Sequence, residues 1–189
     1  YWVAKLQDDV YAIKAGGYEA GREIDFEYAQ KKSKDKSGHS VTIDDKSKVK
    51  SFDGALIPKE IMEREYFAED LTAIRKFTEE VETLDGRMEE MREEESGEDG
   101  LLREVLNEKG DNIPKTNLNK RLKEIKDKGT EETADKEEYA ALTAYKKLMD
   151  KKEAAAKKAK AIRTTLDEKL KVKYGELTVE EIKDLLVEK

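Results

Sequence analysis

Two long stretches of the chain, residues 56–95 and 137–173, carry apolar side chains spaced mostly three or four residues apart. Because an α-helix has about 3.6 residues per turn, this spacing places the apolar side chains on one stripe of each helix. Long helices that are otherwise polar bury such a stripe against a neighbouring helix. We therefore expect a long antiparallel helical hairpin that resembles a coiled coil. The first stripe consists of Phe67, Leu71, Ile74, Phe77, Val81, Leu84, Met88 and Met91, and the second of Leu142, Tyr145, Met149, Ala155, Ala159, Ile162, Leu166 and Leu170.

The charges of the two stretches are opposite. Residues 59–99 contain 16 acidic and 6 basic residues, a net charge of −10, whereas residues 146–173 contain 4 acidic and 11 basic residues, a net charge of +7. Opposite charges favour the pairing of antiparallel helices and help to set their register. Local pairs four residues apart on each helix explain the same charges without changing the hairpin.

The composition limits the class of protein. The chain has 189 residues, of which 44% are charged and 37% hydrophobic, with no cysteine and a net charge of −7. This length allows one domain of moderate size, and the low hydrophobic content is normal for helices with a narrow buried seam. No apolar run approaches the roughly 20 residues that cross a bilayer, and no signal peptide opens the chain. We expect a cytoplasmic protein without membrane partners, and the start at Tyr1 suggests that it was cut from a larger one.

The first 55 residues do not follow the helical pattern. Apolar residues over 2–15 predict a short helix that Gly16-Gly17 ends. Alternating apolar and acidic residues over 24–28 predict a strand. Residues 41–43 and 49–52 either pair as a small hairpin or are extended chain.

Residues 56–189 form the predicted hairpin region, with short helices at its tip and a helix at its end. We expect a helix over 101–107 and another that ends near Gly129. Thr178 and Glu181 have the spacing of a capping box, which predicts the start of a C-terminal docking helix. The expected fold is mainly α: a long helical hairpin, short accessory helices, and a small irregular or β-hairpin segment within residues 1–55.

The sequence lacks the groups that catalysis needs. The single histidine, His39, has no cysteine to complete a metal site. Acidic pairs such as Asp44-Asp45 lie in polar stretches where burial does not raise a carboxylate pKa. No glycine-rich phosphate loop follows a strand, and no serine lies in a nucleophile-elbow motif. We expect that this chain alone is not an enzyme and binds neither a cofactor nor a metal.

Two groups of basic residues are candidates for contact with DNA phosphates, which lysines bind without reading the base sequence. The alternative is that these lysines only solvate a helix or a loop. The first group, in the loop after the predicted strand, is Lys31, Lys32, Lys34 and Lys36, and the second, on the helix before Gly129, is Lys115, Lys120, Arg121, Lys123, Lys126 and Lys128.

Several short segments, in their order along nearly the whole chain, carry a family resemblance. The chain resembles the C-terminal region of the modification (M) subunit of type I restriction–modification DNA methyltransferases. The segments are Asp8-Asp9-Val10-Tyr11-Ala12-Ile13 with Gly16-Gly17, then Leu56-Ile57-Pro58, Tyr66-Phe67, Gly100-Leu101-Leu102, and Lys173-Tyr174-Gly175-Glu176-Leu177-Thr178 with Glu180-Glu181-Ile182-Lys183.

The resemblance implies a role in assembly. In this family the whole M subunit uses S-adenosylmethionine to methylate adenine at N6. It requires a specificity (S) subunit that recognises the DNA target, and the full assembly adds a restriction subunit. The family's Phe-x-Gly-x-Gly cofactor loop and Asn-Pro-Pro-Phe/Tyr catalytic motif are missing from this chain, so no catalytic or cofactor-binding residue carries over. The family's C-terminal helices are thought to pack against helical spacers of the S subunit and to help hold DNA.

We expect S-subunit docking through helix packing by the apolar stripes and the final helix. Two alternatives stay open: a free-standing coiled-coil protein that dimerises or tethers, and a helical arm that binds DNA non-specifically. The predicted docking residues are Phe67, Leu71, Ile74, Leu166, Leu170, Ile182, Leu185 and Leu186.

Overall fold

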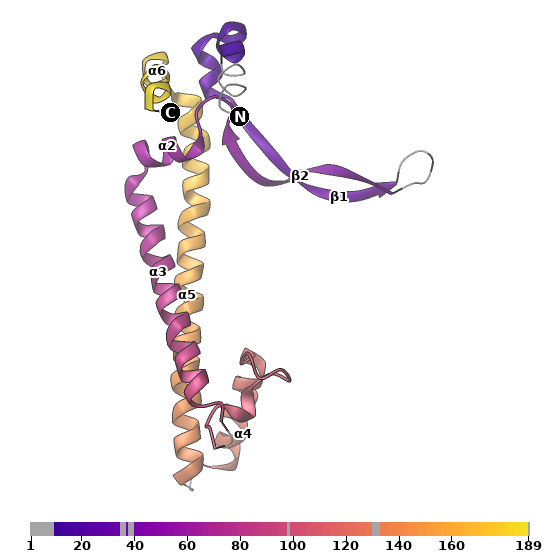
Figure 1. The fold of residues 1–189 in the computed structure, drawn as a ribbon, viewed down its shortest axis with the longest axis vertical. Helices are drawn as coiled ribbons and strands as arrows, with labels where there is room; N and C mark the ends of the chain where they lie inside the picture. Colours follow the sequence, from indigo (N-terminus) through magenta and orange to yellow (C-terminus); the bar gives the residue numbers. More distant parts are fainter. Residues whose placement is uncertain (1–9, 35–36, 38–39, 98, 130–132, 189) are drawn as a thin grey trace. The chain divides into compact units, whose positions relative to one another are not determined.

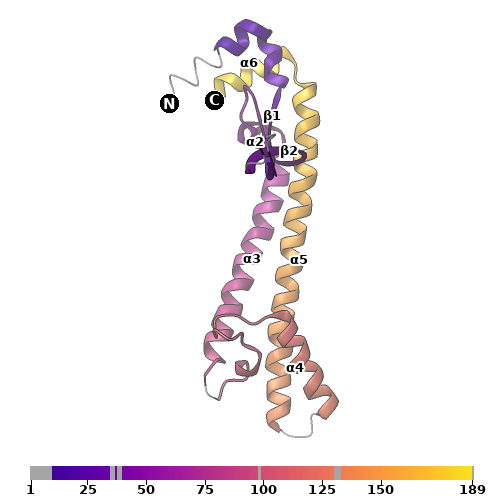
Figure 2. The same ribbon diagram turned by 90° about the vertical axis from the view of Figure 1, so that its right-hand side faces the viewer.

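The computed structural model describes residues 10–34, 37, 40–97, 99–129 and 133–188. These residues are mainly helical, with a two-stranded antiparallel sheet, so the predicted fold class is confirmed (Figures 1 and 2). The chain forms two compact units: unit 1 comprises Tyr1–Leu71 and Arg163–Lys189, and unit 2 comprises Thr72–Ile162. The units do not divide at the predicted boundary after residue 55, because the C-terminal segment packs with the N-terminal one. Local sequence patterns do not predict a contact between such distant segments.

In unit 1, the described part of the chain starts with a helix over residues 10–16, followed by the 3-10 helix η1 (Gly17–Arg22). Gly17 has φ 67, a backbone conformation that glycine adopts without steric cost, and the α-helix ends there as predicted. Residues 2–9 of the predicted first helix lie outside the described residues.

An antiparallel hairpin follows, made of β1 (Ile24–Lys34) and β2 (Ser40–Gly54). The strand predicted over residues 24–28 is confirmed. Of the two alternatives for residues 41–43 and 49–52, the pairing with each other is wrong, because both segments belong to β2 and pair with β1. Each segment is extended, as expected, but the choice of a strand's partner depends on distant residues and not on the local pattern.

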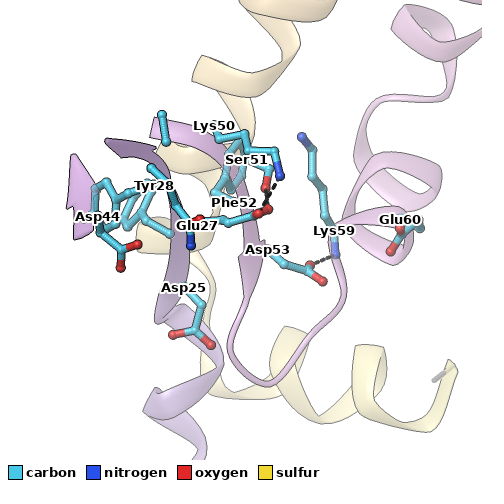
Figure 3. Close-up of a pocket in the computed structure, with 13 residues that line it drawn as sticks. Asp25, Glu27, Tyr28, Asp44, Lys50, Ser51, Phe52, Asp53, Lys59 and Glu60 are labelled. Atoms are coloured by element: carbon cyan, nitrogen blue, oxygen red, sulfur yellow. Dashed lines mark hydrogen bonds and ion pairs between the residues drawn. The ribbon is translucent and has the colours of Figure 1, made fainter. Parts of the chain in front are cut away.

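Cross-strand contacts near the base of the hairpin support its pairing. Phe26 pairs with Phe52, and their ring centroids lie 6.3 Å apart. Lys50 Nζ lies 2.6 Å from Glu27 Oε1 on the opposite strand (Figure 3). Aromatic and oppositely charged pairs of this kind each stabilise a sheet by roughly 0.2–1 kcal/mol.

The predicted first long helix is two helices, α2 (Lys59–Tyr66) and α3 (Ala68–Glu94). Pro58 is extended, with φ −56 and ψ 142, and α2 begins after it. Phe67 separates the helices, with φ −135 and ψ 34, although its N–H still donates to the carbonyl of Glu63 at 3.0 Å. No glycine or proline marks this break, so the apolar spacing, which continues across it, predicted a single helix.

The second long helix, α5 (Thr133–Glu176), exceeds its predicted bounds at both ends. The C-terminal helix α6 (Val179–Glu188) begins with the predicted capping box. Glu181 N–H donates to Thr178 Oγ1 at 3.2 Å, and Thr178 N–H donates to Glu181 Oε2 at 2.7 Å. Ile182 of α6 packs so closely on η1 that a Cβ added at Gly21 would lie 2.7 Å from it.

In unit 2, the parts of α3 and α5 within the unit lie side by side and run antiparallel, as both views show (Figures 1 and 2). Asp85 forms an ion pair with Lys152, and Lys158 Nζ lies 5.3 Å from the centroid of the Phe77 ring. The contacts therefore include an acidic side chain of α3 paired with a basic one of α5, as the opposite charges predict.

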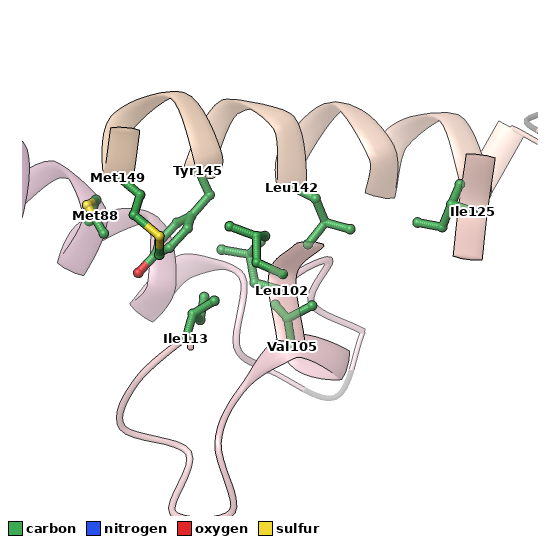
Figure 4. Close-up of a cluster of buried hydrophobic side chains, with 9 residues drawn as sticks. Met88, Leu102, Val105, Ile113, Ile125, Leu142, Tyr145 and Met149 are labelled. Atoms are coloured by element: carbon green, nitrogen blue, oxygen red, sulfur yellow. The ribbon is translucent and has the colours of Figure 1, made fainter. Parts of the chain in front are cut away.

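An apolar cluster fills unit 2 where the short segments meet α3 and α5 (Figure 4). The short segments are η2 (Arg103–Val105), which replaces the longer helix predicted over 101–107, and α4 (Lys115–Lys128). Gly129 caps α4 with φ 91, as its position predicts. The cluster consists of Met88, Leu102, Val105, Ile113, Leu118, Ile125, Leu142, Tyr145 and Met149.

Candidate docking surface and nearby charged sites

Tyr174, near the end of α5, is the centre of unit 1. Its side chain is fully buried, and its hydroxyl donates to the carbonyl of Ile57 at 2.8 Å. Burial raises the pKa of the Tyr174 hydroxyl well above its usual value, so the group stays a donor. Gly54 lies close to this hydrogen bond. A Cβ added to Gly54 would be 2.1 Å from the carbonyl oxygen of Ile57 and 2.6 Å from the Tyr174 hydroxyl. This contact joins the end of α5 to the segment between β2 and α2.

A second polar contact joins α2, α5 and α6. Tyr66 of α2 donates its hydroxyl hydrogen to Glu181 Oε1 at 3.2 Å, and Lys173 Nζ of α5 lies 2.7 Å from the same oxygen. Lys173 Nζ also lies 4.2 Å from the centroid of the Tyr66 ring. The hydrogen bond from Lys173, followed by those from Thr178, lowers the pKa of Glu181 to about 2. Burial, followed by the nearby Glu181 carboxylate, raises the pKa of Tyr66 to about 12.

Four alternating charges pack α2 against α5 in unit 1. Glu63 is only 6% exposed, and Arg163 Nη2 lies 2.8 Å from its Oε1 without the alignment of a hydrogen bond. Lys59 Nζ lies 2.6 Å from Asp167 Oδ1 and 3.9 Å from Glu63 Oε1. Arg163 Nε lies 3.6 Å from the same Asp167 oxygen. The buried carboxylate of Glu63 thus has two positive partners, which a buried charge requires.

The predicted docking residues divide into two groups. Leu166, Leu170 and Ile182 are fully buried and Leu185 is 3% exposed, so these four side chains pack within the chain. The apolar spacing placed them on a stripe but did not show that the chain itself covers it. The other four, Phe67, Leu71, Ile74 and Leu186, are half-buried.

Phe67 borders an open groove of about 510 Å³ on the surface of unit 1, which we call the Val172 groove. Val172 is 59% exposed and lies in α5 outside the buried stripe, between Lys171 and Lys173. In the sequence, Val172 is an apolar residue between two lysines, and an expectation based on the stripe alone does not include it. The remaining lining residues are Thr165, Glu168, Lys169, Lys173 and Glu176.

A second open groove, of about 930 Å³, lies along the base of the hairpin (Figure 3). Its aromatic floor includes Phe52, and Lys59 Nζ lies 4.1 Å from the centroid of that ring. Hydrogen bonds from Lys50 and Ser51 lower the pKa of Glu27. Ser47 and Lys31 likewise lower the pKa of Asp45, farther along the hairpin. These carboxylates are held ionised, which suits charge pairing and not proton donation at neutral pH.

Most of the predicted phosphate-binding residues around α4 have acidic partners within unit 2. Lys115 Nζ lies 2.6 Å from Glu153, and that hydrogen bond raises its pKa. Arg121 makes two hydrogen bonds to Glu138, at 2.6 and 2.8 Å, which raise the pKa of its guanidinium.

Two further cations of this set are paired more loosely. Lys120 lies 3.8 Å from Glu124, and Lys128 lies 3.1 Å from Asp135. Within the part of the chain that the structure describes, Lys123 and Lys126 make no ion pair. Lys115, Arg121 and Lys128 therefore hold α4 to α5, whereas the Lys120 pair lies within α4.

His39 lies outside the described residues. In the described ranges, no three His, Cys, Asp or Glu side chains gather as they would around a metal ion. None of the described helices has a stretch that is long and apolar enough to cross a membrane. Comparisons of the chain with protein-family models, with curated proteins and with solved structures find no match.

Proposed function

We propose that this chain is the C-terminal helical assembly module of the M subunit of a type I restriction–modification DNA methyltransferase. Its role is to dock the S subunit and to help the complex hold DNA in the cytoplasm. The parent enzyme would methylate adenine at N6 with S-adenosylmethionine and would join a restriction subunit in the full assembly. The chain itself contributes no catalytic or cofactor-binding residue, because the motifs that supply them are missing from its sequence.

One observation carries the proposal. Segments that carry the resemblance lie far apart in the sequence but are in direct contact in unit 1. The Leu56-Ile57 segment accepts the hydrogen bond of Tyr174, and Tyr66 donates to Glu181, both across more than 100 residues. Leu56, Ile57, Tyr174 and Leu177 are almost completely buried. If the chain shares the fold of the family, the segments that carry the resemblance should pack together. Their contact in unit 1 therefore supports the resemblance more strongly than their order in the sequence does.

The Val172 groove is the surface that suits an S-subunit helix. An amphipathic helix docks by placing apolar side chains in a groove whose rim is charged. Val172 and Phe67 supply apolar surface, and Glu168, Lys169, Lys173 and Glu176 supply a rim with both signs of charge. The helical spacers that the family resemblance implies for the S subunit fit this description.

Substitution of Val172 tests the docking role. We expect Val172→Asp to weaken binding of the S subunit by about tenfold or more, because it places an unpaired charge in an apolar contact. Val49→Asp is a matched control, since Val49 is 47% exposed and Val172 is 59% exposed, and Val49 lies in β2 away from the groove. Isothermal titration calorimetry measures the affinity, and circular dichroism checks that both variants stay helical. Equal binding by the two variants would contradict docking in this groove.

The free-standing coiled-coil alternative differs in its oligomeric state. It requires a stable homodimer without any partner, whereas the assembly module requires the S subunit for its complex. Sedimentation equilibrium of the chain alone distinguishes the two. A stable homodimer that Val172→Asp dissociates would favour the alternative.

A further inference from the structure

The outer part of the hairpin is strongly basic in a chain that is acidic overall. Residues 30–50 contain seven lysines and three aspartates, while the whole chain has a net charge of −7. Lys36 lies outside the described residues. The other six lysines lie on the two strands of an exposed ribbon, whereas the sequence suggested a basic loop. We define the hairpin lysines as Lys32, Lys34, Lys46 and Lys48, whose side chains are all exposed.

The hairpin lysines differ from their neighbours in having no acidic partner. Lys31 pairs with Asp45 at 3.2 Å, and Lys50 pairs with Glu27 at 2.6 Å. Among the residues that the structure describes, none of the four hairpin lysines makes an ion pair, although the chain contains 45 acidic residues. Asp44 is exposed near Lys32 on the ribbon, yet it makes no ion pair with any lysine of the hairpin that the structure describes. These four charges are available to an anion from outside the chain.

A break in the strand register sets the position of two of them. Tyr28 pairs with Val49, but the next residue of β1, Ala29, pairs with Asp45. The three residues between, Lys46, Ser47 and Lys48, therefore have no partner on β1 and form a bulge. The Asp45 carboxylate accepts hydrogen bonds from the backbone N–H and the hydroxyl of Ser47, at 3.3 and 2.7 Å. The bulge is thus held in a defined turn by its central residue, with a lysine on either side.

On β1, the other two hairpin lysines lie on a single face. Lys32 and Lys34 are two residues apart, and because side chains alternate along a strand they point to the same side, about 6.6 Å apart along it. Thr42 and Ser40 are their partners on β2. These hydroxyls are further groups that can donate hydrogen bonds to phosphate oxygens.

We propose that the β1–β2 hairpin binds the phosphate backbone of duplex DNA through the hairpin lysines. The phosphate chemistry follows from the ribbon, while the identity of the nucleic acid as DNA rests on the proposed function. A two-stranded ribbon is narrow enough to follow a major groove of about 12 Å. Contacts of lysine with phosphate oxygens carry no base-sequence information, so we expect binding that is independent of base sequence.

Salt-dependent DNA binding by paired variants tests this inference. The test variant carries Lys→Gln at all four hairpin lysines, and keeps Lys31 and Lys50 with their acidic partners. The control variant carries Lys→Gln at Lys136, Lys147, Lys151 and Lys157, which are also exposed, and it removes the same charge from α5. Fluorescence anisotropy with a short labelled DNA duplex measures the affinity of the 189-residue chain at several salt concentrations.

We expect the test variant to lose at least about tenfold in affinity at low salt. Its slope of log affinity against log salt should become shallower by about 3.6, because each lost phosphate contact accounts for about 0.9. The control variant should keep the slope of the unaltered chain. A Lys→Arg variant at the same four positions should restore binding, which shows that loss comes from charge and not from unfolding of the hairpin.

Several results would overturn the inference. These are equal losses in the test and control variants, no DNA binding by the unaltered chain, or binding only to an RNA duplex or to vesicles of anionic lipid. Titration of the S subunit into the test variant separates this inference from the proposed function. If the test variant loses DNA binding but still binds the S subunit, both the DNA-binding role of the hairpin and the proposed function are supported. If it loses S-subunit binding but keeps DNA binding, the hairpin lysines do not bind DNA, while the proposed role in S-subunit docking is kept.

Discussion

Both units of this chain bury apolar side chains, but they differ in the polar groups that are packed among them. Unit 1 places hydrogen-bonding and charged groups inside its packing: the Tyr174 hydroxyl on Ile57, and Glu63 between Lys59 and Arg163. Unit 2 buries a cluster of apolar side chains and keeps its ion pairs, such as Lys115 with Glu153, near the surface. A buried hydrogen bond or ion pair requires one arrangement of its groups, because a buried polar group without a partner costs free energy. The free energy of apolar burial depends mainly on the area removed from water and not on direction.

This difference has a consequence for a docking surface. The Val172 groove lies in unit 1, on the part of α5 that Tyr174 and Lys173 tie to α2 and α6. A groove between elements that are fixed by directional contacts has its shape before a partner arrives, and this lowers the cost of binding. We expect substitutions that remove single polar atoms to matter in unit 1 and to have little effect in unit 2.

The largest effect should come from a cavity in unit 2. Leu118→Ala removes most of a fully buried side chain from the apolar cluster. We expect it to lower the free energy of unfolding of this unit by about 3 kcal/mol, within the range for buried leucines. Hydrogen exchange measured by mass spectrometry reports the two units separately. Unchanged protection of α4 would show that the cluster does not hold this unit together.

Overpacking of unit 1 should have the next largest effect. Gly54→Ala places a methyl group within 2.1 Å of the Ile57 carbonyl oxygen. We expect a loss of about 2–3 kcal/mol, because the displaced groups are backbone and a buried tyrosine that cannot move aside. Gly86→Ala is the matched control, since nothing lies within 4 Å of the added Cβ there. Unchanged protection of α6 and the hairpin in Gly54→Ala, or an equal loss in Gly86→Ala, would contradict this prediction.

The same substitution in both units sharpens the comparison. Tyr174→Phe leaves the buried carbonyl of Ile57 without its donor, and we expect a loss of about 1–3 kcal/mol. Tyr145 is also buried, but no hydrogen bond from its hydroxyl to the described residues is present. Tyr145→Phe should therefore change stability by less than about 0.5 kcal/mol. Chemical denaturation and hydrogen exchange compare the two, and equal effects would remove the distinction between the units.

The smallest expected effect is on the pH dependence of stability, through the Glu181 carboxylate. The folded-state pKa of Glu181 is lowered from 4.5 to about 2, chiefly by the hydrogen bond from Lys173. A lowered carboxylate pKa stabilises the folded state above about pH 4.5, and this contribution is lost as the pH falls toward 2. Glu181→Gln should thus be less stable than the unaltered chain at pH 7, with the difference shrinking toward pH 2. A difference that is constant over this range would show that the ionised carboxylate does not contribute.

The sequence predicted the elements whose signals are local. Apolar spacing located the long helices, Gly129 located the end of α4, and Thr178 with Glu181 located the start of α6. It did not predict the partner of β2, which depends on a distant strand, or the break at Phe67, which no glycine or proline marks.

The docking residues show the same limit. The stripe correctly identified Leu166 and Leu170 as side chains that need cover, but the chain supplies that cover itself. Val172 lies off the stripe and was missed for that reason. The hairpin lysines were recognised only in part, as loop charges, since Lys46 and Lys48 become part of one basic ribbon only after the strands pair.

The most direct test of the assembly module is hydrogen exchange of the chain alone and with the S subunit. The proposal predicts that the S subunit adds protection over residues 165–176 of α5 and near Phe67, where the Val172 groove lies. Protection that the S subunit adds only elsewhere, or none at all at concentrations where it binds, would contradict the proposal.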